Sequence, residues 1–168
     1  MTIDIFSADE QSAVAIDLGR WSELCRHALE DEGVRGLAEV SLIFSDEETI
    51  AQLNQQFMGK SGPTDVLSFP IDDEPLPSGR TPDAGGVGPG ESPEPEIPQL
   101  VGDIVICPTV AVRNAKEHEC SLDDEIALLV VHGVLHLLGW DHKVDDEAER
   151  MEAREQELLR RHYRPSTT

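Results

Sequence analysis

Three of the chain's six histidines lie close enough together in the sequence to bind one metal ion. His132 and His136 are four residues apart, so on a helix both imidazoles project from one face. Gly139 can adopt the left-handed conformation that ends many helices, and the chain beyond it could bring His142 to the same point. Three neutral imidazole nitrogens leave the fourth position of a tetrahedral Zn²⁺ open to water, as in catalytic zinc sites. The spacing therefore predicts one metal ion per chain, which we expect to be Zn²⁺, bound by His132, His136 and His142.

A core role is the alternative for these histidines. On an apolar helix the ring nitrogens of a buried histidine bond to the backbone or to water. Residues 126–138 are nearly all apolar, so His132 and His136 would each need such partners to offset the loss of water. A metal ion satisfies both rings at once, and we therefore favour a metal site. Three imidazoles also suit nickel, copper and iron, so the spacing alone does not select the metal.

A zinc site of this kind supports hydrolysis, because the metal polarises a carbonyl or phosphoryl oxygen and acidifies water. The chain matches the metzincin metallopeptidase motif H-E-x-x-H-x-x-G-x-x-H except that Gly133 replaces the glutamate general base. Loss of a general base costs a rate factor on the order of 10²–10⁴, which argues against a peptidase and favours phosphodiester hydrolysis. Asp141 could act as a base or could orient the adjacent His142, and the sequence leaves both roles open.

Length and charge limit the classes of protein to consider. The 168 residues predict one domain, and the net charge of −21 argues against non-specific adhesion to nucleic acid or to an anionic membrane. No signal peptide and no apolar run of about 20 residues is visible, so we expect a cytoplasmic protein without a membrane partner. The three cysteines are odd in number and predict reduced thiols. Arginines crowd the C-terminal segment, where a charge run usually forms a solvated helix face.

Apolar spacing predicts an α+β fold in which a small mixed sheet packs against about five helices. The helix over 121–138 is apolar nearly all round from Ile126 to Leu138, so we expect it to be the central buried helix that carries the metal ligands. The last helix places Met151, Glu155 and Leu158 on one stripe. The predicted strands cover 3–5, 39–44, 66–69 and 100–107, and the predicted helices cover 13–29, 45–57, 108–118, 121–138 and 144–162.

Residues 72–98 differ in composition from the rest of the chain. The segment holds seven of the eleven prolines, five of the thirteen glycines and seven acidic residues. Such a segment cannot bury enough apolar surface to offset the entropy of ordering it. It therefore predicts a mobile, acidic surface loop within the single domain of residues 1–168.

Three blocks of the sequence resemble the signature of the YbeY family, the bacterial metal-dependent endoribonucleases that act in ribosomal RNA maturation. They are the histidine run His132–His142, the segment from Gly59-Lys60 through Pro63–Pro70, and the strand Gly102–Cys107. Outside the acidic loop, the resemblance covers roughly residues 38–160. It implies a four-stranded sheet and a zinc ion held by the three histidines.

The resemblance also implies a substrate and partners. Members of the family cleave single-stranded RNA, act on the 3′ end of 16S ribosomal RNA and take part in ribosome quality control. We therefore expect single-stranded RNA and ribosomal RNA as substrates and the ribosome or its small subunit as a partner, with no role for DNA. Two alternatives remain, a non-catalytic ribosome-assembly factor with a structural metal and an atypical metallopeptidase.

One position departs from the family pattern. Many members carry an arginine just before Gly59-Lys60 that is thought to contact the RNA phosphate, and here that residue is Met58. Lys60 is the candidate that replaces it in catalysis, although lysine lacks the bidentate geometry of arginine. The alternative for Lys60 is an ordinary solvated loop residue. The acidic loop would repel RNA unless it lies away from the cleft.

Overall fold

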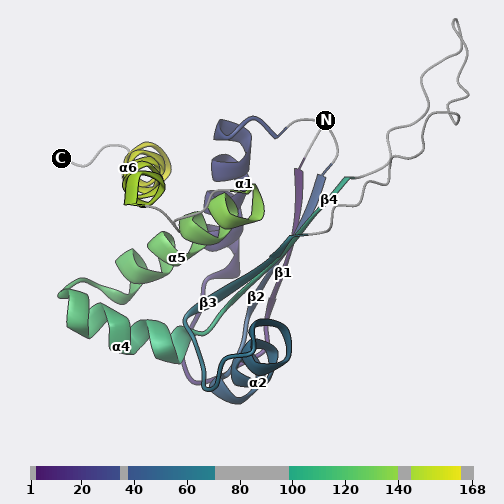
Figure 1. The fold of residues 1–168 in the computed structure, drawn as a ribbon, viewed down its shortest axis with the longest axis vertical. Coiled ribbons are helices and arrows are strands. Elements are labelled where there is room, and N and C mark those ends of the chain that lie inside the picture. Colours follow the sequence, from purple (N-terminus) through teal and green to yellow (C-terminus); the bar gives the residue numbers. More distant parts are fainter. Residues whose placement is uncertain (1–2, 35–37, 71–98, 140–144, 164–168) are drawn as a thin grey trace, which may run out of the picture.

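The computed structural model describes residues 3–34, 38–70, 99–139 and 145–163. Within these ranges the chain forms one mixed four-stranded sheet and five helices, which confirms the predicted α+β fold class (Figure 1). The predicted acidic loop at about 72–98 lies outside the described residues.

The sheet has the strand order β1-β2-β4-β3. β1, β2 and β4 run parallel, whereas the edge strand β3 is antiparallel to β4. In β4, Ile104, Val105 and Ile106 are all buried, because helices cover both faces of the sheet at this strand. The strands are β1 (Ile3–Asp9), β2 (Ala38–Phe44), β3 (Val66–Pro70) and β4 (Gln99–Ile106).

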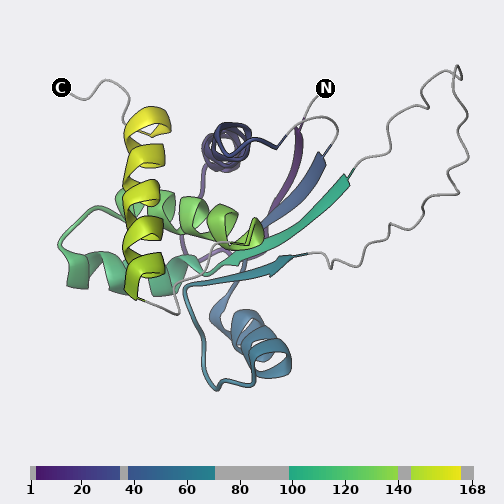
Figure 2. The ribbon, with the colours of Figure 1, turned by 45° about the horizontal axis from the view of Figure 1, so that its top comes forward.

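The helices lie on both faces of the sheet (Figure 2). α5 lies on one face with α1 beside it, and it contacts α1, α4, α6, β3 and β4. α6 packs against α5 and α1, and α2 lies on the opposite face of the sheet. α5 is thus the central buried helix that the sequence predicts. The helices are α1 (Leu18–Asp31), α2 (Glu47–Leu53), α4 (Pro108–His118), α5 (Leu122–Leu137) and α6 (Asp145–His162).

The first helix begins later than its apolar spacing predicts. Predicted over 13–29, it starts at Leu18, because the side chain of Asp17 accepts a backbone N–H of the first turn at 3.2 Å. The preceding residues form a loop in which the side-chain amide of Gln11 bonds to both backbone groups of Val14. These local side-chain bonds compete with the helix, although the apolar spacing continues through them.

The second helix also differs from its prediction. It does not continue as one α-helix to Phe57 but widens into a single π-helical turn, η1 (Asn54–Met58). The turn ends at Gly59, whose φ of +68° is the left-handed conformation that favours glycine. Buried Asn54 donates from its side-chain amide to the carbonyl oxygen of Gly62 at 2.9 Å. This bond fixes the start of the segment that leads to β3.

Two apolar clusters hold the helices on the sheet. The larger cluster lies between the sheet and α1, α5 and α6, and the smaller one fills the space between α2 and the opposite face. The three cysteines are free thiols, and two of them, Cys25 and Cys107, are buried. Burial raises the pKa of the Cys25 thiol to about 12, so this group stays protonated and unreactive.

A bulge in β4 brings the last turn of α5 against the sheet. The register of β4 shifts opposite the Glu39–Val40 step, and Gly102 has a φ of +147°. A Cβ atom at this position would lie 2.5 Å from the carbonyl oxygen of Phe69 and 2.5 Å from Cδ2 of Leu137. Only glycine fits there, and the close approach holds the turn of α5 that carries His136 against β3 and β4.

Charged side chains join the end of α1 to the end of α6. Asp31 accepts hydrogen bonds from His162 Nε2 at 2.9 Å and from Arg161 at 2.9 Å, and Arg154 lies between Asp31 and Glu32. The hydrogen bond from His162, together with those from Arg161 and Arg154, lowers the pKa of Asp31 to about 2. Two of the C-terminal arginines therefore form ion pairs within the fold.

Replacing Asp31 with asparagine should lower the free energy of unfolding by about 2 kcal/mol at pH 7. The pKa of Asp31 lies below its ordinary value of 3.8 in the folded protein, so the stabilisation is complete above about pH 4 and is lost as the pH falls through about 2. Urea unfolding at pH 7, 5 and 3 measures the difference. The exposed Glu30→Gln variant on the same helix is the control, and a loss in Asp31→Asn that did not shrink toward pH 3 would contradict this account.

Candidate functional site

α5 brings two of the three predicted metal ligands together. The ring centroids of His132 and His136 lie 4.5 Å apart with an angle of 78° between the ring planes. Both side chains are half-buried, at the end of the helix that lies against the sheet. Past the helix, Gly139 has a φ of +99°, the left-handed conformation expected there. His142 and Asp141 lie outside the described residues.

A carboxylate from another helix contacts the first histidine. Oε2 of Glu155 on α6 lies 2.5 Å from Nδ1 of His132. The Glu155 side chain is 9% exposed and that of His132 is 28% exposed. The sequence placed Glu155 on the apolar stripe of its helix but did not identify it as a site residue. A carboxylate among apolar residues on this stripe could have indicated a special role for Glu155. The spacing does not show which residue Glu155 contacts.

Gly133, between the two histidines, is the point at which α5 touches the sheet. It is buried, and a Cβ atom there would lie 2.8 Å from Cγ2 of Ile104 on β4. Its carbonyl oxygen accepts a hydrogen bond from Oγ of Ser68 on β3 at 3.1 Å. The residue that replaces the peptidase base therefore has a packing role, since any side chain at this position would point at the sheet.

Lys60 and Met58 lie on the segment between α2 and the edge strand β3. Both side chains are exposed, on the segment that includes η1 and the turn after it. Phe57 of η1 packs edge-on against Phe69 of β3, with ring centroids 5.3 Å apart, while Ser68 contacts α5 from the same strand. The edge strand β3 thus contacts both α5, which carries the histidine pair, and η1, which precedes Lys60.

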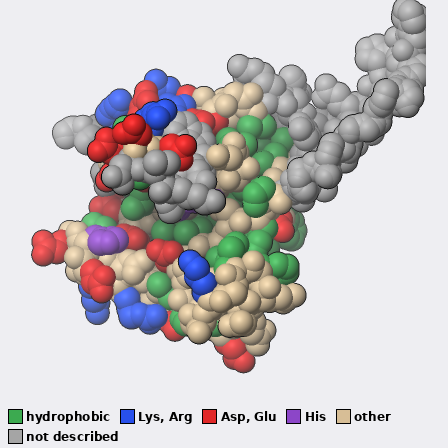
Figure 3. Space-filling model, in the orientation of Figure 1, with side chains coloured by type: hydrophobic (Ala, Val, Ile, Leu, Met, Phe, Trp, Pro, Cys, Tyr) green, Lys and Arg blue, Asp and Glu red, His purple; other side chains and the backbone are tan. Residues whose placement is uncertain are grey.

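The surface charge is unevenly distributed on the face that Figure 3 presents. Basic side chains gather over α6 and over α4, with hydrophobic and acidic side chains between them. Arg113 on α4 pairs with Glu47 at 2.9 Å, and Arg161 on α6 pairs with Glu157 at 2.8 Å. Part of this positive charge is therefore neutralised by neighbouring carboxylates.

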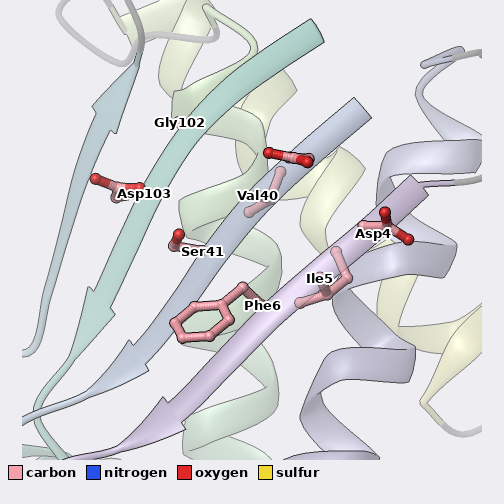
Figure 4. Close-up of a pocket in the computed structure, with 8 residues that line it drawn as sticks. Asp4, Ile5, Phe6, Val40, Ser41, Gly102 and Asp103 are labelled. Atoms are coloured by element: carbon pink, nitrogen blue, oxygen red, sulfur yellow. The ribbon is translucent and has the colours of Figure 1, made fainter. Parts of the chain in front are cut away.

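A separate groove of about 690 Å³ lies on the sheet itself (Figure 4). Side chains alternate along a strand, and Ile104 faces α5, so neighbouring Asp103 faces the opposite side of the sheet. Phe6 is 65% exposed at this groove. None of its described lining residues is a histidine or a basic residue, so we do not assign the chemistry of the histidines to it. The lining residues are Asp4, Ile5, Phe6, Glu39, Val40, Ser41, Gly102 and Asp103.

The fold and the site define an α+β protein whose central helix carries a histidine pair next to a buried carboxylate. Residues 6–163 match the protein family described as Endoribonuclease YbeY. The chain belongs to this family, which confirms the resemblance noted from the three sequence blocks. Among the described residues, no helix combines the length and the apolar character that a membrane span requires.

Individual relatives agree with the family match. A protein named Endoribonuclease YbeY from Thermobifida fusca (strain YX) is 43% identical over 160 residues, covering 95% of this chain and 92% of that protein. The protein of the same name from Salinispora tropica is 41% identical over 160 residues, covering 95% and 94%. The solution structure of TM1509 from Thermotoga maritima is 26% identical with a TM-score of 0.56, covering 99% of this chain and 94% of that one.

Proposed function

We propose that this protein is a zinc-dependent endoribonuclease that cleaves single-stranded RNA during ribosomal RNA maturation. Relatives at about 40% identity are named endoribonucleases, and RNA is the substrate that such a name implies. The observation that carries the proposal is the adjacency of His132 and His136 on the central helix. The finer role includes processing of the 3′ end of 16S ribosomal RNA and ribosome quality control. Such a function would be carried out in the cytoplasm, with the ribosome or its small subunit as the partner and without DNA.

The donor set fits a zinc ion. Two imidazoles meet at the end of α5, and His132 has the carboxylate contact that metal-ligating histidines usually make through their second nitrogen. In this proposal His132, His136 and His142 hold one Zn²⁺ per chain. When bound, the ion would polarise a phosphoryl oxygen of the RNA and lower the pKa of a water molecule toward about 7.

The chain's own residues have separate tasks in this proposal. Exposed Lys60 offers a positive charge to an RNA phosphate, a contact that Met58 cannot make. Asp141 either takes a proton from water or orients the adjacent His142. The net charge of −21 repels RNA in general, so productive binding depends on a few local contacts at the cleft.

Removing the metal should abolish RNA cleavage. Purified protein incubated with a labelled single-stranded RNA is expected to cleave it, to stop when a chelator is added and to resume when Zn²⁺ is returned. A duplex of the same sequence is the control substrate and should remain intact. Metal analysis of the purified protein should find one zinc per chain. Cleavage that continued at full rate after complete metal removal would overturn the proposal.

A second candidate is a ribosome-assembly factor with a structural metal, which acts by binding alone. Exposed Met58, at the place where many members have an arginine, favours it because methionine supplies no charge. This candidate predicts co-sedimentation with ribosomes that persists in the His132→Ala variant, and no cleavage of RNA by the unmodified protein. An atypical metallopeptidase is disfavoured by the packing of Gly133 against the sheet.

A further inference from the structure

We propose that Glu155 is a positioning residue that fixes the ring of His132, so that Nε2 is the nitrogen presented to the metal. The inference rests on the proposed function, because it assigns a role within the same metal site. Glu155 comes from α6, a different helix from the one that carries the histidine pair.

The contact determines which ring nitrogen carries the proton. An ionised carboxylate can only accept hydrogen bonds, so Nδ1 of His132 donates its proton to Oε2 of Glu155 across 2.5 Å. In a neutral imidazole with the proton on Nδ1, the lone pair that a metal ion requires is on Nε2. A ring nitrogen already bonded to a carboxylate is not available as a ligand, which leaves Nε2 for the metal.

The surroundings hold the carboxylate in place. Met151 and Leu158 are buried one turn before and after Glu155, so both sides of this helical face are anchored in the core. Glu155 as a whole residue is 7% exposed. A carboxylate removed from water to this extent needs a partner to offset its desolvation. The His132 ring is therefore held by a rigid element rather than by a mobile loop.

A purely structural ion pair between α5 and α6 is the alternative role for Glu155. It would stabilise the packing of the two helices without any effect on the preference of His132 for one ring nitrogen. The Glu155→Gln variant separates the two roles, because the amide keeps the shape of the side chain and removes its charge. The matched control is Glu152→Gln, the same change at an exposed position on the same helix.

Zinc affinity is the first measurement. Competition with a chromophoric chelator should show that Glu155→Gln weakens binding of Zn²⁺ by about 10- to 100-fold, the range typical for loss of a residue that orients a metal ligand. Glu152→Gln should bind as the unmodified protein does. Thermal unfolding of both variants tests whether the fold is retained. Equal zinc affinity in Glu155→Gln and the unmodified protein would overturn the proposal.

The proton position is the second measurement, and it needs no variant. Long-range ¹H–¹⁵N correlation spectra of the metal-free full chain at pH 8 should show Nδ1 of His132 protonated and Nε2 unprotonated. A proton on Nε2 would overturn the proposal even if Glu155→Gln failed to fold. Zinc binding without any RNA cleavage would overturn the proposed function alone, whereas failure of the unmodified protein to bind zinc would overturn both.

Discussion

Replacing His136 with alanine is expected to reduce cleavage of single-stranded RNA by more than about 100-fold while leaving the protein folded. Loss of a group that merely orients a metal ligand typically costs 10- to 100-fold, so loss of a ligand should cost more. His136 is half-buried at the end of α5, and its ring contacts that of His132, so truncation opens space at the site rather than in the core. Initial rates on a labelled RNA measure the effect, and circular dichroism checks the fold.

His27→Ala is the matched control for this experiment. His27 lies on α1 with 39% of its side chain exposed, and its ring centroid lies 5.5 Å from that of His162. Its removal should leave the cleavage rate within about a factor of two, because it belongs to neither the histidine pair nor β3. Cleavage by His136→Ala at the rate of the unmodified protein would show that the histidine pair is not the catalytic centre.

The histidine pair could be predicted because its geometry is local. Two residues four apart on an α-helix face the same way whatever the rest of the chain does, and the apolar run around them predicts the helix itself. Ser121 supplies the expected cap, since its side chain accepts the backbone N–H of Asp124 at 3.0 Å. The start and the end of α5 could therefore both be predicted from the sequence.

The contact between Glu155 and His132 could not be predicted, because it depends on how α6 packs across α5. The apolar stripe indicates which face of α6 points inward, but not which side chain of α5 it meets. The strand order has the same origin. β4 lies between β2 and β3, and this order depends on contacts between segments far apart in the sequence.

The arginines near the C-terminus show how the structure changes an interpretation of charge. The sequence indicates a solvated helix face. In the structure Arg154 and Arg161 are engaged by Asp31, Glu32 and Glu157. Their charge is used to hold α6 on α1, and α6 in turn carries the carboxylate at His132. The net charge of the chain therefore gives little information about the electrostatic field at the histidine pair.

Replacing Gly133 with glutamate would restore the metallopeptidase motif, yet we expect the variant to lose its fold instead of gaining peptidase activity. The added Cβ atom would lie 2.8 Å from Cγ2 of Ile104, and the carboxylate beyond it would enter the layer between α5 and β4. Overpacking costs about 1–3 kcal/mol, and an unpaired buried charge adds several more, so the total should exceed about 4 kcal/mol. Urea unfolding and hydrolysis of a peptide library measure the two outcomes.

Gly19→Glu provides the matched control for that substitution. Gly19 is an exposed helical glycine in the first turn of α1, and the nearest atom to an added Cβ is Oδ1 of Asp17 at 3.6 Å. Glutamate has a higher helix propensity than glycine and favours the first turn of a helix, so this variant should change stability by less than about 1 kcal/mol. If Gly133→Glu were instead as stable as Gly19→Glu and hydrolysed peptides, α5 would have to lie farther from β4 than the structure places it. In that case the type of reaction would explain the glycine at position 133. The close contact with Ile104 indicates instead that packing against β4 requires it.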